Sequence, residues 1–237
     1  MSATGPARLM SILGLLAAGP SEGTRALCEV AAQVTGMSGA GMMLLGDDGP
    51  RGSLCTTDSV STLIENLQYT LGEGPCVDAH THGSAVLEPD LADPDVARWP
   101  AFAPAALAGG AQAVFGFPVR IGVVRLGALN LYRNRPGPLS DDAHADALVM
   151  ADVAARAVLA LQADAPPGTL AAGLAAEADF QFVVHQAAGM VSVQLDISVA
   201  DALVRLRAFA FRADRLIAEV AKDVVNRQLR FDSPDDQ

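Results

Sequence analysis

Four residues of the kinds that bind metals or carry acid–base and thiol chemistry stand at alternate positions: Cys76, Asp78, His80 and His82. On a β-strand, alternate side chains share one face, and the four would then form a candidate ligand set for a transition metal. The string instead follows the turn-forming segment LGEGPC, after which a helix is expected. A helix would point the four side chains in different directions, and the sequence offers no second pair of ligands. We therefore predict no metal site.

Cys76 also offers a thiol for redox chemistry. A helix start beside it would lower its pKa and favour the reactive thiolate, whereas a buried cysteine would be inert. The sequence contains neither G-x-G-x-x-G nor G-x-x-x-x-G-K-[ST], so it lacks both common phosphate-binding loops. Of the functions considered, an enzyme with redox chemistry at Cys76 is the least favoured, and we predict that the protein is not an enzyme.

Aromatic residues make up only 5% of the chain, so those near the middle of the sequence stand out as lining for an apolar ligand pocket. The candidates are Trp99, Phe102, Phe115 and Phe117, together with Cys76. An aromatic side chain beside a sheet belongs more often to the core than to a cofactor site. The sequence therefore names no cofactor, and any small-molecule ligand is unknown.

The charge is distributed unevenly. The chain has a formal net charge of −11 and a pI near 4.6, which argues against a general nucleic-acid binder. Residues 1–176 hold 9 Lys/Arg against 17 Asp/Glu, whereas residues 180–231 hold 7 against 5. The C-terminal segment is thus the part of the chain with an excess of positive charge.

Three apolar stripes at helical spacing run through this C-terminal segment. They predict helices over about 180–195, 198–212 and 216–224, the second one capped by Ser198, and a compact bundle that buries the stripes against one another. Its surface carries arginines but little catalytic chemistry. The candidate contacts for RNA are Arg205, Arg207, Arg212 and Arg215, followed by Gln186 and Ser192.

The three cysteines, Cys28, Cys55 and Cys76, cannot all pair with one another, so we expect no disulfide framework and a reducing compartment. The apolar run from Met10 to Ala18 is too short and too interrupted by glycine for a membrane span. These features predict a soluble, cytoplasmic protein with no membrane partner.

The segment before residue 163 alternates helices and strands. We expect short helices near 9–18, 22–34, 60–69 and 99–107, with Ser21 capping the second, and a long helix from Ser140 to Gln162. Hairpins are expected over 41–56 and 113–132, with a further strand at 85–87. The pattern predicts an α+β fold in which helices flank an antiparallel sheet.

The sequence VHQAAGMVSVQLDISVADALVRLRAFAF followed by LIAEVAKDVV resembles an ANTAR domain, the RNA-binding module of bacterial antitermination regulators, over about residues 177–231. The resemblance rests on Ala187 and Gly189, on Ala202, Leu206, Arg207 and Ala210, and on Leu216 with Glu219, Val220 and Ala221. Two positions depart from the family pattern, because Ala188 replaces a common lysine and Ser192 a common methionine. The resemblance implies binding of hairpins in nascent transcripts, usually by a dimer, so that a terminator cannot form.

The segments LGEGPC, AVLEPDL and VFGFPVRIGVVRLGALNLYR, followed by PLSDDA, resemble a GAF domain over about residues 20–160. This resemblance implies a sensory domain that binds a small ligand on one face of its sheet and dimerises through flanking helices. GAF followed by ANTAR is an arrangement typical of actinobacterial antitermination regulators. The expected domains are an N-terminal extension (1–19), the GAF-like sensor (20–163), a linker (164–176), the ANTAR-like module (177–231) and a tail (232–237).

Together these features predict a signal-responsive RNA-binding regulator of transcription antitermination. The alternative is a sensor-controlled protein–protein interaction module that does not bind RNA. In either case we expect a homodimer, whose seam lies along the long helix near heptad spacing: Leu148, Val149, Val153, Ala157 and Leu161.

Overall fold

The computed structural model describes residues 4–19, 23–46, 49–93, 98–163, 179–213 and 215–231. The chain divides into two compact units, Met1–Ala175 and Ala176–Gln237. The expected linker at 164–176 and tail at 232–237 lie outside the described residues.

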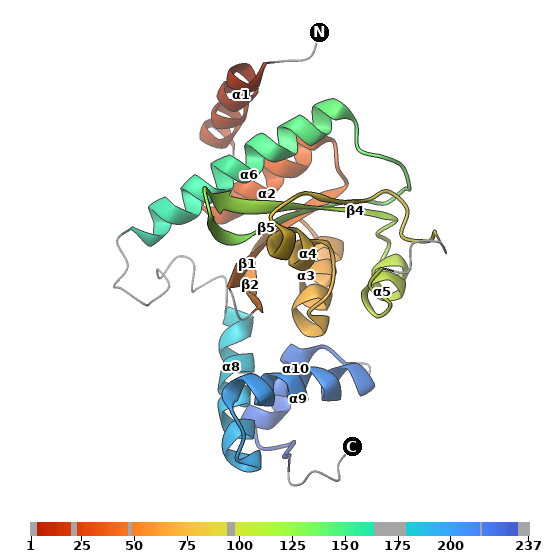
Figure 1. The fold of residues 1–237 in the computed structure, drawn as a ribbon, viewed down its shortest axis with the longest axis vertical. Helices are drawn as coiled ribbons and strands as arrows, with labels where there is room; N and C mark the ends of the chain where they lie inside the picture. Colours follow the sequence, from red (N-terminus) through yellow and green to blue (C-terminus); the bar gives the residue numbers. More distant parts are fainter. Residues whose placement is uncertain are drawn as a thin grey trace. The chain divides into compact units, whose positions relative to one another are not determined.

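An antiparallel sheet forms the centre of the N-terminal unit (Figure 1). Its strands stand in the order β2-β1-β5-β4-β3. Their bounds are β1 (Gly39–Gly46), β2 (Gly49–Thr56), β3 (Val86–Glu88), β4 (Ala113–Ile121) and β5 (Val124–Arg133). Both predicted hairpins, β1–β2 and β4–β5, are confirmed, and Gly122 makes the second turn with a φ of 58° that other residues rarely adopt.

Three helices lie on one face of this sheet: α1 (Gly5–Ala18), α2 (Thr24–Thr35) and α6 (Asp141–Gln162). The Ser140 hydroxyl accepts a hydrogen bond from the Ala143 N–H at 3.2 Å, which confirms the predicted start of the long helix. Aliphatic and aromatic side chains of the sheet and helices form the main core between them. The core includes Leu27, Met42, Phe115, Phe117, Leu129, Leu131, Ala147 and Met150.

Three further described helices lie on the opposite face (Figure 1): α3 (Ser59–Leu71), α4 (Pro75–His82) and α5 (Phe102–Ala108). Asp58 begins α3 through a capping box, accepting from the Ser61 N–H at 2.8 Å while the Ser61 hydroxyl accepts from the Asp58 N–H at 3.0 Å. The cap predicted at Ser21 lies outside the described residues, and the residue that precedes α2 is Gly23.

A polar contact that the sequence did not indicate ties α1 to α6. The guanidinium of Arg8 is buried and forms ion pairs with Asp142 and, at 2.6 Å, with Asp146. Because a buried cation needs partners, this pairing fixes where α1 packs on α6.

The expectation of reduced cysteines was wrong. Cys28 on α2 and Cys55 on β2 form a disulfide, with a Cα–Cα distance of 6.1 Å. Both sulfurs lie on the α2 and α6 side of the sheet, whereas Cys76 is a buried free thiol. The fold brings a helix and an edge strand together at two cysteines that are 27 residues apart.

The C-terminal unit is a bundle of α8 (Asp179–Leu195), α9 (Val199–Arg212) and α10 (Ile217–Val225). The predicted stripes are buried at Val184, Ala187, Ala188 and Val191, at Ala202, Leu206 and Ala210, and at Ile217, Val220, Ala221 and Val224. Val199 is an exception, because it is the first residue of α9 and half of it is exposed. The Ser198 hydroxyl accepts from the Asp201 N–H at 3.1 Å, as predicted.

Membrane-spanning potential is weak in the described helices. None of them is by itself long and apolar enough to cross a bilayer, although the bent pair Val183–Leu195 and Val199–Arg212 passes the same test when taken together.

Candidate functional site

A row of residues with little side-chain bulk crosses the sheet on the face that α3 and α4 cover. Asn130 on β5 pairs with Gly41 on β1 and with Gly116 on β4, so the three residues stand side by side. A Cβ at Gly41 would lie 2.7 Å from Glu65 Oε1, and a Cβ at Gly116 would lie 2.3 Å from the Pro75 carbonyl oxygen. The two glycines thus admit the Glu65 side chain and the start of α4 directly against the backbone of the sheet.

Glu65 is a carboxyl group enclosed between α3 and the sheet. It is only 1% exposed, and neither of its oxygens forms a hydrogen bond of normal geometry with any described residue. Burial raises its pKa to about 8, and interaction with the Asn130 amide offsets part of that rise. Near pH 7 the group is therefore mostly a neutral acid that can both donate and accept a hydrogen bond.

Further polar atoms without partners surround this carboxyl. Asn130 lies beside the Glu65 carboxyl, but within the described part of the chain neither its side-chain atoms nor the Nε2 of Gln68 form a hydrogen bond of normal geometry. Leaving a buried polar atom unpaired costs about 1–3 kcal/mol, so a protein retains several of them where water or a ligand completes the set. We call Glu65, Gln68 and Asn130 the buried polar cluster.

Gln68 connects the cluster to Cys76. Its Oε1 accepts the Cys76 backbone N–H at 2.7 Å, at the start of α4. Burial, together with the nearby Glu65, raises the pKa of the Cys76 thiol well above its ordinary value. The thiol is held in its neutral form, which is the opposite of what a reactive cysteine at a helix start requires.

The five predicted pocket residues do not meet at one site. Phe115 and Phe117 alternate with Gly116 on β4, so they face the main core, where the Phe117 ring lies 5.3 Å from the His144 ring of α6. Trp99, Phe102 and Cys76 lie on the other face, with α4 and α5. Trp99 donates from Nε1 to Asp78 at 3.0 Å, and its ring packs edge-on against Phe102.

The alternating string at 76–82 forms helix α4, as the preceding turn indicated. The Asp78 carboxylate accepts a hydrogen bond from Trp99. The backbone carbonyls of His80 and Thr81 accept hydrogen bonds from the Arg125 guanidinium at 2.9 and 2.7 Å. Among the described residues no three His, Cys, Asp or Glu side chains come close enough together to hold a metal ion.

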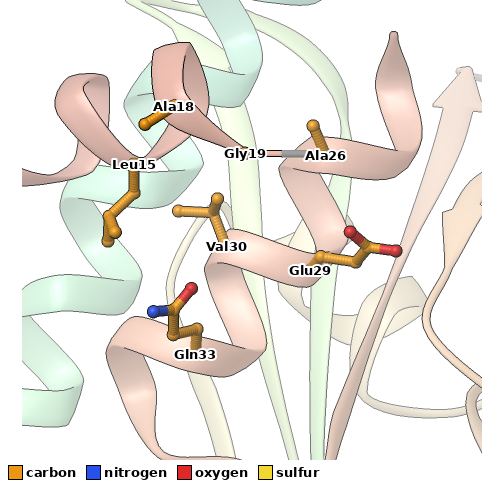
Figure 2. Close-up of a pocket in the computed structure, with 7 residues that line it drawn as sticks. All are labelled: Leu15, Ala18, Gly19, Ala26, Glu29, Val30 and Gln33. Atoms are coloured by element: carbon orange, nitrogen blue, oxygen red, sulfur yellow. The ribbon is translucent and has the colours of Figure 1, made fainter. Parts of the chain in front are cut away.

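A small hollow opens between α1 and α2 (Figure 2). It has a volume of about 130 Å³ and is lined by Leu15, Ala18, Gly19, Ala26, Glu29, Val30 and Gln33. Ligand pockets usually measure about 300–1,000 Å³. Glu29 at its rim is already paired with Arg25 at 2.9 Å, so this hollow is a poor candidate for a ligand site.

The predicted RNA-contacting residues occupy different environments in the C-terminal unit. Arg205 and Arg212 are seven residues apart on α9, and both are exposed on its outward side. The guanidinium of Arg212 also lies 5.6 Å from the centre of the Phe209 ring. Arg207 is half-buried, with two of its guanidinium nitrogens inaccessible to solvent.

The other three candidates also differ in their surroundings. Arg215 forms ion pairs with Asp223 at 2.7 Å and with Glu219 at 3.7 Å, so two carboxylates already balance its charge. The Ser192 hydroxyl donates to the Ile197 carbonyl at 2.6 Å and thereby closes the end of α8. Gln186 is exposed on α8. Arg205 and Arg212 are thus the candidates best placed to reach a phosphate backbone.

Comparison with known proteins matches residues 17–159 to the GAF domain. The chain belongs to the GAF family. The match begins at the end of α1, spans the sheet, helices α2 to α5 and most of α6, and ends before the C-terminal unit. No curated protein matches the chain.

Solved structures agree on the fold of this GAF domain. The GAF domain of an Acinetobacter phosphoenolpyruvate-protein phosphotransferase is 13% identical, with a TM-score of 0.52, and the match covers 69% of this chain and 98% of that one. The corresponding domain from Coxiella burnetii is 14% identical over 67% and 95% of the two chains, with a TM-score of 0.48. At 13% identity, the likeness to the Acinetobacter domain shows the fold alone.

The buried polar cluster of the GAF domain was missed in the sequence. Gly41 and Gly116, each in the middle of an apolar strand, are the signal that could have found it, since glycine inside a strand often marks a close approach. Which residue approaches each glycine depends on strand register and helix placement, and neither is visible in the local sequence.

Proposed function

We propose that this protein is a signal-responsive regulator in which a GAF sensor controls a C-terminal RNA-binding module, and that it binds hairpins in nascent transcripts to prevent transcription termination. The GAF domain is a sensory and signalling domain. The C-terminal bundle is a separate compact unit, and its sequence resembles an ANTAR module. In this proposal the protein is cytoplasmic, where a disulfide such as Cys28–Cys55 is uncommon, and it is not an enzyme.

The observation that carries the proposal is the outward face of α9. Arg205 and Arg212 lie one above the other on that face, at the spacing of two helical turns, where their charges can follow a phosphate backbone. An acidic residue, Asp201, also lies on this face near the start of the helix. Its carboxylate accepts a hydrogen bond from the Ser198 hydroxyl at 2.6 Å.

The signal in this proposal is a small polar molecule that enters the buried polar cluster. Glu65, Gln68 and Asn130 present donors and acceptors that no other described side chain completes. The GAF resemblance implies a ligand on one face of the sheet, and this proposal assigns it to the face that α3 and α4 cover, where these residues lie. A ligand there would reposition α3 and α4 against the sheet.

RNA binding is tested with the full chain and a pool of stem–loop RNAs whose loop bases are randomised. We expect salt-dependent binding by the wild-type protein. Arg205→Glu with Arg212→Glu should weaken it at least about tenfold and reduce the slope against log salt by about 2, because two phosphate contacts are lost. Fluorescence anisotropy over a salt series measures both quantities.

The control for this experiment is Arg25→Glu, which makes the same kind of substitution at one exposed arginine of the GAF domain. It should bind like the wild type. Equal binding to duplex DNA, or no stem–loop binding by the wild-type chain, would contradict the proposal. A protein partner that is captured equally by the double arginine variant would favour the interaction module instead.

Dimerisation through α6 is part of the proposal, with a revised seam. Val153 packs into the domain's own core, whereas Leu148 and Leu159 are exposed, 11 residues apart on one side of the helix. We expect a wild-type dimer by light scattering at micromolar concentration, and a monomer for Leu148→Glu with Leu159→Glu. Val123→Glu, at an exposed valine of the β4–β5 turn, should remain dimeric; a wild-type monomer would refute this part.

A further inference from the structure

Two large apolar side chains stand out on the same outward face of α9. Phe211 is 61% exposed and Val204 is 60% exposed, and their spacing of seven residues places them one above the other. Burying such side chains is favourable, so a compact unit that leaves both in solvent has a surface to which a partner adds contact area.

Arginines border this apolar pair. Arg205 follows Val204 and Arg212 follows Phe211, so the positive charges form a second row alongside the apolar one. Arg207 lies towards the opposite border, at the edge of the buried stripe. We call Val204, Phe211, Arg205 and Arg212 the α9 patch.

Phe211 differs from the other aromatic residue of this helix. Phe209 is half-buried, its ring packs edge-on against Phe231 at 5.4 Å, and the Arg212 guanidinium covers it at 5.6 Å. The ring of Phe209 is thus used within the bundle. Phe211 instead carries its ring out into solvent, and the exposed Arg212 follows it on the helix.

We propose that Phe211 is a stacking platform for an unpaired RNA base, with Val204 extending the apolar contact and Arg205 and Arg212 holding the phosphates on either side of that base. This inference rests on the proposed function and names the part of the RNA that the α9 patch reads. Paired bases bury their faces inside the helical stack, so a protruding phenyl ring on a convex helix finds a partner only where a base is unstacked.

Charge complementarity favours RNA over an apolar protein surface as the occupant. A protein docking on Val204 and Phe211 would have to cover the flanking guanidinium groups with its own acidic groups, at a cost in desolvation. A nucleic acid supplies the two required features together, a flat apolar base and an anionic backbone at its edge. Stacking on an aromatic side chain tolerates every base, so Phe211 contributes affinity for loops rather than a sequence code.

The test uses the full chain and a stem–loop selected by the wild type from the randomised pool. Phe211→Ala and Phe211→Leu should each weaken binding about tenfold to a hundredfold, whereas Phe211→Trp should bind as well as the wild type, because only the tryptophan keeps a π-face. Bound RNA should also quench the added tryptophan of Phe211→Trp, beyond any change in Trp99 that the wild type shows. Val193→Ala, at an exposed valine of α8, is the control and should not alter affinity.

The outcomes separate this inference from the proposed function. If the wild type binds no stem–loop, both fail. If it binds and Phe211→Ala and Phe211→Leu bind equally well, the stacking inference is overturned while the proposed function stands. If Phe211→Ala instead converts a dimer to a monomer with RNA affinity retained, the α9 patch is a contact between copies of the chain, and the inference is again overturned. Circular dichroism should show unchanged helix content, because the side chain is exposed.

Discussion

Reduction of the disulfide between Cys28 and Cys55 should lower the free energy of unfolding of the GAF domain by about 3 kcal/mol, since the bond closes a loop of 27 residues in the unfolded chain. The bond also ties α2 to β2, an edge strand whose pairing with β1 is interrupted by register shifts. Trp99, the single tryptophan of the chain, is buried in the GAF domain. Thermal unfolding followed by its fluorescence, with and without reductant, therefore reports on this domain alone.

Single variants provide the control for the disulfide. Cys28→Ser and Cys55→Ser should both unfold near the temperature of the reduced wild type and should not respond to reductant. Cys76→Ala, which removes the free thiol, should keep the response. Alkylation of the unfolded, unreduced wild type should modify one cysteine; modification of all three would show that the bond does not form.

The disulfide between Cys28 and Cys55 could not be predicted from the sequence. The count of three cysteines said only that they cannot all pair with one another, and it was interpreted as favouring reduced thiols. A bond requires Cα atoms about 4.4–6.8 Å apart, and the 6.1 Å separation of Cys28 and Cys55 arises only when α2 packs on the hairpin. That packing is a tertiary fact with no local signature.

Elements with local chemical signals were predicted well. The starts of α6 and α9 at Ser140 and Ser198 follow from caps within a few residues of each helix end. The apolar stripes of α8, α9 and α10 repeat at the helical period, so their burial could be predicted without knowledge of the fold.

The ligand face of the sheet could not be assigned from local signals. Alternation on β4 puts Phe115 and Phe117 on one face and Gly116 on the other, but it does not say which face carries the main core. The aromatic pocket candidates therefore included residues of both faces, Phe115 and Phe117 on one and Trp99 and Phe102 on the other. Two residues of the buried polar cluster, Glu65 and Asn130, are 65 positions apart and meet only through the packing of α3 on the sheet.

Replacing Glu65 with glutamine should stabilise the GAF domain at neutral pH, because the buried carboxyl is stable there only as the neutral acid. Its pKa is about 8 in the folded domain, against an ordinary value of 4.5. Between these two pH values the folded state holds a proton that the unfolded chain has released, so the free energy of unfolding falls as pH rises from about 4.5 to about 8. Glu65→Gln cannot ionise and escapes this loss, which amounts to about 3 kcal/mol at pH 7.

The pH dependence separates this effect from a simple change in packing. Fluorescence of Trp99 during thermal unfolding should give nearly equal melting temperatures for wild type and Glu65→Gln at pH 4.5, with the variant increasingly higher towards pH 8. Glu29→Gln, at a partly exposed carboxylate on α2, should follow the wild type throughout. A constant difference at every pH would mean that packing dominates, and a wild type that grows more stable from pH 5 to pH 8 would mean that Glu65 is ionised. The same neutral acid is what would let the buried polar cluster donate a hydrogen bond to a bound ligand, so an ionised Glu65 would also remove a premise of the proposed sensor site.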